Sequence, residues 1–243
     1  MPVTYQAKDS IGTITMDDGK VNALSIQMLS DLNGALDQAL ADRAVVVLTG
    51  REGVFSAGFD LGVLRAAGSE AATMLRAGFE LAERILSFPT PVVIACSGHA
   101  IAMGLFLLLS GDYRVGAAGP HKITANEVAI GLTMPRAAVE ICRQRLTPAH
   151  FNRIVTIAEP CSADDVVAAG ILDRVVPASE LQVVARDIAA QLVNLDMAAH
   201  AASKLRARDQ TLKAIRAAIE ADEADRQAMS AGASAIGESP GKR

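Results

Sequence analysis

Hydrophobic and polar residues alternate along the start of the chain, over residues 3–9 and again over 11–19. A period of two is typical of strands that have one buried face and one exposed face. Ser10 lies between the two alternating stretches. The pattern therefore predicts an antiparallel hairpin that opens the fold.

Beyond the hairpin the pattern changes to helices followed by short apolar runs. Leucines recur at three- and four-residue intervals after Ser25, a residue type that caps helices, and the run AVVVLTG follows at 44–50. A second helical pattern over 72–87 precedes the run PVVIACSG at 91–98. Such runs are typical of strands buried on both faces. Helices that alternate with these strands predict an α/β fold with a parallel sheet.

The second half of the chain is predicted to be mostly helical. Residues 100–112 form a segment too long and too rich in leucine for a strand, which predicts a buried helix starting close to a strand end. Further helices are expected over 137–146, from Thr147-Pro148 onward, from Ser162 to Gly170, and from about Leu181 to the C-terminal region. Nothing in the pattern indicates a repeat or a second-domain linker.

Composition and charge exclude several classes of protein. The 243 residues are 51% hydrophobic with a net charge of −4, so the chain is globular and nucleic acid is not expected as a partner. Only 3% of residues are aromatic, which leaves an aliphatic core and no platform for stacking bases. The longest weakly charged stretch, 89–111, is broken by Ser, Gly and His, so no membrane association is expected.

The cysteines and histidines give no sign of a disulfide framework or a metal site. Cys96, Cys142 and Cys161 are widely spaced and mostly flanked by apolar residues, which favours reduced thiols and a cytoplasmic location. The four histidines show no ligand spacing, so we expect no metal. The glycines fit neither a phosphate loop nor a dinucleotide fingerprint, and no nucleophile elbow is present.

Candidate chemistry centres on Glu127, the one charged residue in the stretch 123–135. It is either an ordinary exposed side chain or a poorly solvated carboxylate whose raised pKa suits a proton carrier. The stretches 55–61 and 97–106 each follow a buried strand and hold small residues that let backbone N–H groups approach a ligand. The alternative interpretation is that both stretches are simply tight turns. With Glu127 they would suffice to abstract a proton next to a carbonyl group.

Five motifs in a fixed order make the chain resemble the crotonase, or enoyl-CoA hydratase/isomerase, superfamily. They are VNAL at 21–24, FSAGFDL at 55–61, PVVIACSGHAIAMG at 91–104, NEVAIGLTMP at 126–135 and AAGILDRVV at 168–176. The resemblance runs from about Val3 to Leu205. It implies a spiral of repeated ββα units with a helical C-terminal region, and a coenzyme A thioester as substrate. No separate cofactor is implied, because coenzyme A is part of that substrate.

The resemblance also assigns residues to the site. Glu127 would be the base, and the backbone N–H groups of Phe59 and Met103 would form an oxyanion hole. Segments that wrap coenzyme A match Ala23, Ala57, Asp60 and Leu61, and Lys20 could reach a phosphate, although a lysine before a helix is usually just solvated. Apolar residues at three positions suggest an acyl slot but would suit any core: Phe106, Leu132 and Met134.

The chain departs from the family pattern at residue 106 and at residues 102–103. Hydratases with two carboxylates have a glutamate where this chain has Phe106, and a phenyl ring can neither accept nor donate a proton. The related isomerases have an apolar residue there and an Asn-Glu pair matching 126–127. We therefore expect an enzyme of fatty-acid metabolism that shifts the double bond of 3-enoyl-CoA to 2-enoyl-CoA. Alanine and methionine at 102–103 replace common glycines, so a positive φ at Met103 would be strained.

Three alternatives remain open. The chain could catalyse hydration, another enolate reaction such as decarboxylation or thioester hydrolysis, or no reaction at all as an acyl-CoA carrier. The expected organisation is an α/β core over 1–190, a helical trimerisation region over 191–230, and a disordered tail over 231–243. A trimer or a dimer of trimers is expected, because apolar residues on this helical region call for a partner surface. Packing against the chain's own core would satisfy them equally. These residues are Leu205, Leu212, Ile215 and Ile219.

Overall fold

The strands form two sheets, and after the opening hairpin each ββ pair (β3 and β4, β5 and β6, β7 and β8) adds one strand to each sheet. The computed structural model describes residues 1–66, 68–162 and 164–237. The larger sheet has the order β1-β2-β3-β5-β7-β9 and the smaller one the order β4-β6-β8. The strands are β1 (Val3–Lys8), β2 (Ile11–Met16), β3 (Val45–Thr49), β4 (Gly53–Ser56), β5 (Val92–Cys96), β6 (Gly98–Ile101), β7 (Tyr113–Ala117), β8 (Ile123–Thr124) and β9 (Arg174–Val176).

The predicted opening hairpin is confirmed. Strands β1 and β2 pair antiparallel, with Val3 opposite Met16 and Lys8 opposite Ile11. Asp9 and Ser10 form the turn with φ values of 55° and 60°. Positive φ at both central residues is what a two-residue hairpin turn of type I′ requires. From β2 onward the neighbours in the larger sheet pair in parallel.

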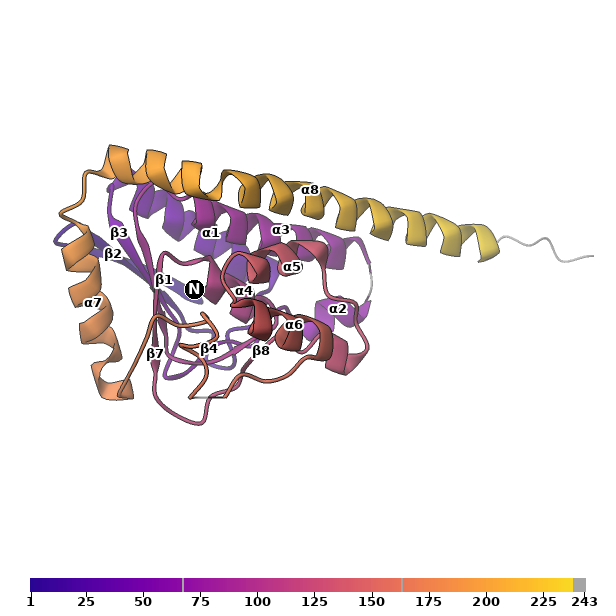
Figure 1. Ribbon diagram of the computed structural model, residues 1–243. Helices are drawn as coiled ribbons and strands as arrows, with labels where there is room; N and C mark the ends of the chain where they lie inside the picture. Colours follow the sequence, from indigo (N-terminus) through magenta and orange to yellow (C-terminus); the bar gives the residue numbers. More distant parts are fainter. Residues whose placement is uncertain (67, 163, 238–243) are drawn as a thin grey trace, which may run out of the picture.

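Helices cover both faces of the larger sheet. They are α1 (Ile26–Ala41), α2 (Leu61–Ala66), α3 (Ser69–Ser87), α4 (Met103–Ser110), α5 (Arg136–Arg143), α6 (Pro148–Ile157), α7 (Leu181–Leu192) and α8 (Met197–Gly237), with 3-10 turns η1 (Val128–Ile130) and η2 (Ala178–Glu180). On β3, Val46 and Leu48 pack into the core under α1 and α3, whereas Val45 and Val47 pack against α7. Because successive side chains of a strand point to opposite faces, the sheet has a hydrophobic core on each face (Figure 1).

Several helix predictions hold and two need correction. Ser25 caps α1, its hydroxyl accepting from the Met28 N–H at 3.2 Å. The leucine-rich segment 100–112 begins as strand β6, and its helix starts only at Met103. Residues 164–170 form turns where a helix was expected, because the Gly170 N–H bonds to the Val167 carbonyl and does not continue the helical pattern.

The last helix, α8, lies across α3 and α5 and extends past the body of the protein (Figure 1). Its first half is held by Asp112, whose carboxylate pairs with Lys204 at 2.6 Å and Arg208 at 2.9 Å. The same carboxylate accepts the Val92 N–H at 2.7 Å. This helix occupies most of the region 191–230. Of the predicted disordered tail, residues 231–237 form the end of α8 and 238–243 lie outside the described residues.

The four apolar residues that suggested a partner surface on α8 are mostly covered by the chain's own core. Ile215 and Ile219 are buried, and Leu212 packs against the same cluster. Leu205 alone of the four is largely exposed, at 47%. The expected oligomer therefore stays a prediction, and these positions no longer supply its main support. Within the described ranges, no helix combines the length and the apolar character needed to span a membrane.

Candidate active site

Two sequence motifs that lie 30 residues and more apart are hydrogen-bonded to each other. The Ala57 N–H donates to the Val21 carbonyl at 3.0 Å, and the Leu24 N–H donates to the Gly58 carbonyl at 2.8 Å. Between these bonds the Ser56 hydroxyl donates to the Asn22 carbonyl at 2.8 Å. The VNAL segment is thereby fixed against Ser56 at the end of β4 and against residues 57–60, which we call the Gly58 loop.

Asn22 is the polar centre of this contact. It is fully buried with φ of +51°, a value that asparagine tolerates better than most residues. Its side-chain amide donates to the Met16 carbonyl at 2.9 Å and to the Phe55 carbonyl at 3.1 Å. Its Oδ1 accepts the Asp18 N–H at 3.0 Å. The side chain therefore ties the end of β2 to the end of β4.

The Gly58 loop lies directly against residues 101–104, which we call the Met103 turn. Gly58 has φ of +88°, and a methyl group on it would lie 2.8 Å from the Ile101 carbonyl oxygen and 3.2 Å from the Met103 nitrogen. Gly104 packs so closely on the Ser56 carbonyl that a side chain there would overlap it. Glycines at both positions thus bring the predicted donors Phe59 and Met103 into neighbouring turns.

The backbone N–H groups of Phe59 and Met103 have no hydrogen-bond partner within the described part of the chain. Phe59 lies between β4 and α2, and Met103 is the first residue of α4, where N–H groups have no carbonyl of their own helix to bond. The N-terminal end of a helix also carries partial positive charge. Both donors are therefore available to a ligand oxygen.

The strain expected at Met103 falls one residue earlier. Ala102 has φ of +50° and ψ of −122°, whereas Met103 begins the helix with ordinary backbone angles. A positive φ at a residue with a side chain costs about 1–3 kcal/mol and persists only where the surroundings hold it. Here the Ala102 N–H donates to the Thr124 carbonyl at 2.9 Å, and its carbonyl accepts from Leu105 at 2.9 Å.

Glu127 follows the strand that borders the Met103 turn. Thr124 pairs with Ile101 at the end of β8, and three residues later Glu127 is the N-cap residue of the 3-10 turn η1. Its side chain is only 8% exposed, which removes the reading of an ordinary surface glutamate. Oε2 is buried with no hydrogen-bond partner in the described residues. Burial raises the pKa of Glu127, and a hydrogen bond from its own backbone N–H opposes the rise only in part.

The five positions predicted to contact coenzyme A lie at or beside the contact between the two motifs. Ala23 and Ala57 are half-buried in it, while Lys20 and Leu61 are exposed at its edge. Asp60 caps α2, since its Oδ1 accepts the Gly62 N–H at 2.7 Å. That bond gives Asp60 a structural role as well as its predicted binding role.

The three predicted acyl residues differ in exposure. Phe106 is 1% exposed, and its ring stacks on Phe79 of α3 with centroids 6.3 Å apart. Phe79 in turn meets Phe59 edge to face at 6.1 Å. Met134 is buried, but Leu132 is 51% exposed, so this chain alone does not enclose it. Phe106 thus belongs to a row of rings that starts at the Gly58 loop.

Sequence reasoning missed the residues that hold the site together. Asn22 and Ser56 lie inside the two motifs, and a fully buried polar side chain needs partners, but the sequence does not reveal which ones.

Two of the histidines, His99 and His121, lie together although their spacing in the sequence gave no sign of it, and their rings pack edge to face with centroids 5.5 Å apart. Within the described residues, no group of three or more His, Cys, Asp or Glu side chains could hold a metal ion.

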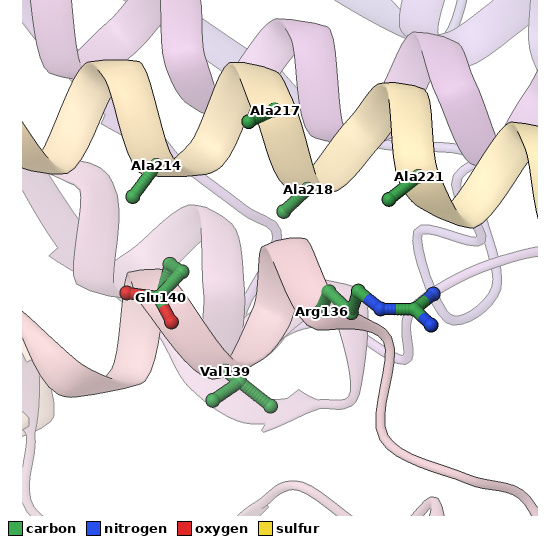
Figure 2. A pocket seen from close by; sticks show the side chains of 7 residues that line it. All are labelled: Arg136, Val139, Glu140, Ala214, Ala217, Ala218 and Ala221. Carbon is green, nitrogen blue, oxygen red and sulfur yellow. The ribbon is translucent and has the colours of Figure 1, made fainter.

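A groove of about 360 Å³ lies between α5 and α8, apart from these loops (Figure 2). Alanines of α8 face longer side chains of α5 across it; it is lined by Arg136, Val139, Glu140, Ala214, Ala217, Ala218 and Ala221. None of the predicted site residues lines this groove. It is therefore not the candidate active site.

Comparison with known proteins identifies the family of the chain. The sequence model of the enoyl-CoA hydratase/isomerase family matches residues 6–235. The structure of an enoyl-CoA hydratase from Mycobacterium ulcerans is 49% identical, covers 92% of this chain and 99% of that chain, and has a TM-score of 0.89. An enoyl-CoA isomerase structure from Mycobacterium tuberculosis is also 49% identical, covering 92% and 98%, with a TM-score of 0.89.

A curated relative agrees with these structures. The carnitinyl-CoA dehydratase of Salmonella typhi is 31% identical over 194 residues, which cover 79% of this chain and 74% of that protein. The repeated ββα units, the two sheets and the ordered motifs are those expected of the crotonase superfamily. The chain belongs to the enoyl-CoA hydratase/isomerase family of that superfamily.

Proposed function

We propose that this protein is an isomerase that converts 3-enoyl-CoA to 2-enoyl-CoA. The observation that carries the proposal is Glu127, a buried carboxylate whose Oε2 has no protein partner, on the segment that borders the Met103 turn. A buried carboxylate oxygen without a partner costs free energy, which is difficult to explain without a ligand.

The mechanism uses one base and two backbone donors. Glu127 removes a proton from C2 of the 3-enoyl thioester, and the electrons move into the thioester oxygen to give a dienolate. The N–H groups of Phe59 and Met103 bind that oxygen as its charge grows. Glu127 then returns the proton to C4, the double bond ends between C2 and C3, and the carboxylate is regenerated.

The raised pKa of Glu127 suits this role. A base is most effective when its pKa is close to the working pH, and burial moves the pKa of Glu127 upward from its ordinary value. The two donors act where α4 begins, so the partial positive charge of the helix end adds to them. Removal of one such donor typically lowers kcat by about 10²- to 10³-fold.

Hydration of a 2-enoyl-CoA is the second candidate, because relatives with hydratase and dehydratase names support it. The Mycobacterium tuberculosis relative supports both candidates in sequence terms, because one of its structures is named an isomerase and another a probable hydratase. The deciding feature is Phe106, which occupies the position of the first hydratase glutamate. Its ring is stacked on Phe79 and supplies no group to activate a water molecule.

We further infer that the protein binds its substrate as a trimer or a dimer of trimers. The exposed apolar side chains of Val128, Ile130 and Leu132 follow Glu127 directly, at 40%, 55% and 51% exposure. Exposed apolar groups this close together call for a cover. A mass by light scattering that corresponds to three or six chains would support the assembly, and a monomeric mass at micromolar concentration would contradict it.

Turnover of the two enoyl isomers tests the proposed reaction. The purified protein should convert 3-enoyl-CoA to 2-enoyl-CoA and hydrate 2-enoyl-CoA far more slowly. Faster hydration than isomerisation would favour the second candidate. Acyl-CoA binding without turnover of either isomer would indicate the carrier that the sequence left open.

A further inference from the structure

We propose that Ser56 is a positioning residue that sets the distance between the two N–H donors of the active site. This inference rests on the proposed oxyanion hole and adds a residue that touches neither the substrate nor the reacting atoms. Ser56 is the last residue of β4 and is completely buried. It contacts the Gly58 loop through its side chain and the Met103 turn through its backbone.

The side-chain contacts use the hydroxyl in both directions. Ser56 Oγ donates to the Asn22 carbonyl at 2.8 Å and accepts the Gly58 N–H at 3.1 Å. The Gly58 N–H belongs to the Ala57–Gly58 peptide, one peptide before the one that carries the Phe59 N–H. Ser56 therefore fixes the orientation of the loop one residue ahead of the predicted donor.

The backbone contact reaches the second donor. Gly104, the residue after Met103, packs on the Ser56 carbonyl with no room for a side chain. Gly58 itself lies against the Ile101 carbonyl and the Met103 nitrogen. A shift of Ser56 would consequently move the Gly58 loop relative to α4, and the spacing of the two donors would change with it.

Loss of the hydroxyl has a predictable result. In Ser56→Ala the Gly58 N–H and the Asn22 carbonyl lose a partner inside the protein, and the loop must move to regain one. Misplacement of a catalytic group by about 1 Å can cost about 10²-fold in rate. The predicted contacts to coenzyme A lie along the rest of the loop, so binding should be affected far less than polarisation of the thioester.

The experiment measures polarisation directly. Infrared difference spectra of butanoyl-CoA with a 13C-labelled thioester carbonyl are recorded for the wild type, Ser56→Ala, Ser56→Cys and Ser110→Ala, free and bound. Ser110 is the matched control, because it is equally buried and its hydroxyl also donates to a backbone carbonyl, that of Phe106 at 2.8 Å. Saturated butanoyl-CoA cannot isomerise, so the carbonyl frequency reports only the oxyanion hole.

We expect binding to the wild type and to Ser110→Ala to lower the carbonyl frequency by the same amount. Ser56→Ala should show a smaller shift, with kcat about 10- to 100-fold lower and KM nearly unchanged. Ser56→Cys keeps a weak acceptor of similar shape and should give an intermediate shift, which also protects the test if Ser56→Ala does not fold.

Three results would overturn the inference, and they are distinguishable. A full frequency shift in both Ser56 variants would show that Ser56 does not position the donors, while the oxyanion hole itself stands. The absence of a shift in the wild type would overturn the oxyanion hole and the role of Ser56 together. An equal loss of shift in Ser110→Ala would show that the effect comes from general destabilisation.

Discussion

A methyl group on Gly58 would lie 2.8 Å from the carbonyl oxygen of Ile101. This close approach joins two segments that are separated by more than 40 residues and that each carry an unpartnered backbone N–H, on Phe59 and on Met103. The Gly58 loop follows β4, the Met103 turn follows β6, and β8 leads to Glu127. Because β6 pairs with both β4 and β8, the candidate site is assembled where three ββα units meet.

Gly58→Ala should separate these two segments. The new methyl group meets the backbone of Ile101 at φ of +88°, so we expect a loss of about 2–4 kcal/mol in the free energy of unfolding together with a large loss of turnover. Urea unfolding and steady-state kinetics would measure both. Gly53→Ala is the control, since Gly53 has φ of +76° but open space around it. It should cost about 1–2 kcal/mol and leave kcat unchanged; an equal loss of kcat in Gly53→Ala would contradict the argument.

The buried carboxylate of Glu127 should make stability depend on pH. Its pKa in the folded state is raised above the ordinary value of 4.5, so ionisation destabilises the folded protein. Glu127→Gln should therefore match the wild type in Tm below pH 4.5 and exceed it increasingly as the pH rises through the raised pKa. Above that pKa the difference should stay constant. A Tm difference that is independent of pH would mean that the carboxylate is not desolvated.

Phe106→Glu tests why hydration is disfavoured. The variant places a carboxylate where hydratases have one, so hydration of a short 2-enoyl-CoA should increase relative to isomerisation. The side chain is 1% exposed, and the substitution should also cost about 3 kcal/mol or more in stability. Phe79→Glu, in the adjacent ring of the stack, should be similarly destabilising without any gain in hydration. Equal hydration rates in both variants would remove Phe106 from the acyl site.

Asp112→Asn should loosen α8 from the core. The carboxylate neutralises the buried ends of Lys204 and Arg208, and breaking a buried ion pair typically costs about 3–5 kcal/mol. Asp209→Asn is the control. It removes a carboxylate of α8 that pairs with Lys213, whose side chain is 75% exposed, so the loss of stability should stay below about 1 kcal/mol. Comparable urea midpoints for the two variants would show that Asp112 does not anchor the helix.

Much of the fold could be predicted from the sequence, because local patterns determine it. The hairpin around Ser10 and the capped helix after Ser25 both follow from residue types and spacing within a few positions. The strands of the smaller sheet were not found by pattern alone. Strands β4 and β6 are only four residues each and hold glycines and polar residues, so they read as turns.

The candidate site was predictable in its chemistry and not in its connections. Glu127 stood out because its neighbours are apolar, and the structure buries it as a poorly solvated carboxylate would be. Asn22 and Ser56 gave no such signal, since their importance comes from carbonyl groups more than 30 residues away. The positive φ at Ala102 was expected at Met103, because the sequence does not show where β6 ends and α4 begins.

The most direct test of the central claim is the rate of 3-enoyl-CoA isomerisation by Glu127→Gln, measured beside its affinity for acyl-CoA. The glutamine keeps the size of the side chain and removes the base, so kcat should fall by about 10²- to 10⁴-fold, as is typical when general acid-base catalysis is lost. Binding of acyl-CoA should hardly change, because the thioester oxygen is held by the backbone of Phe59 and Met103. Isomerisation that continues at the wild-type rate in Glu127→Gln would contradict the account.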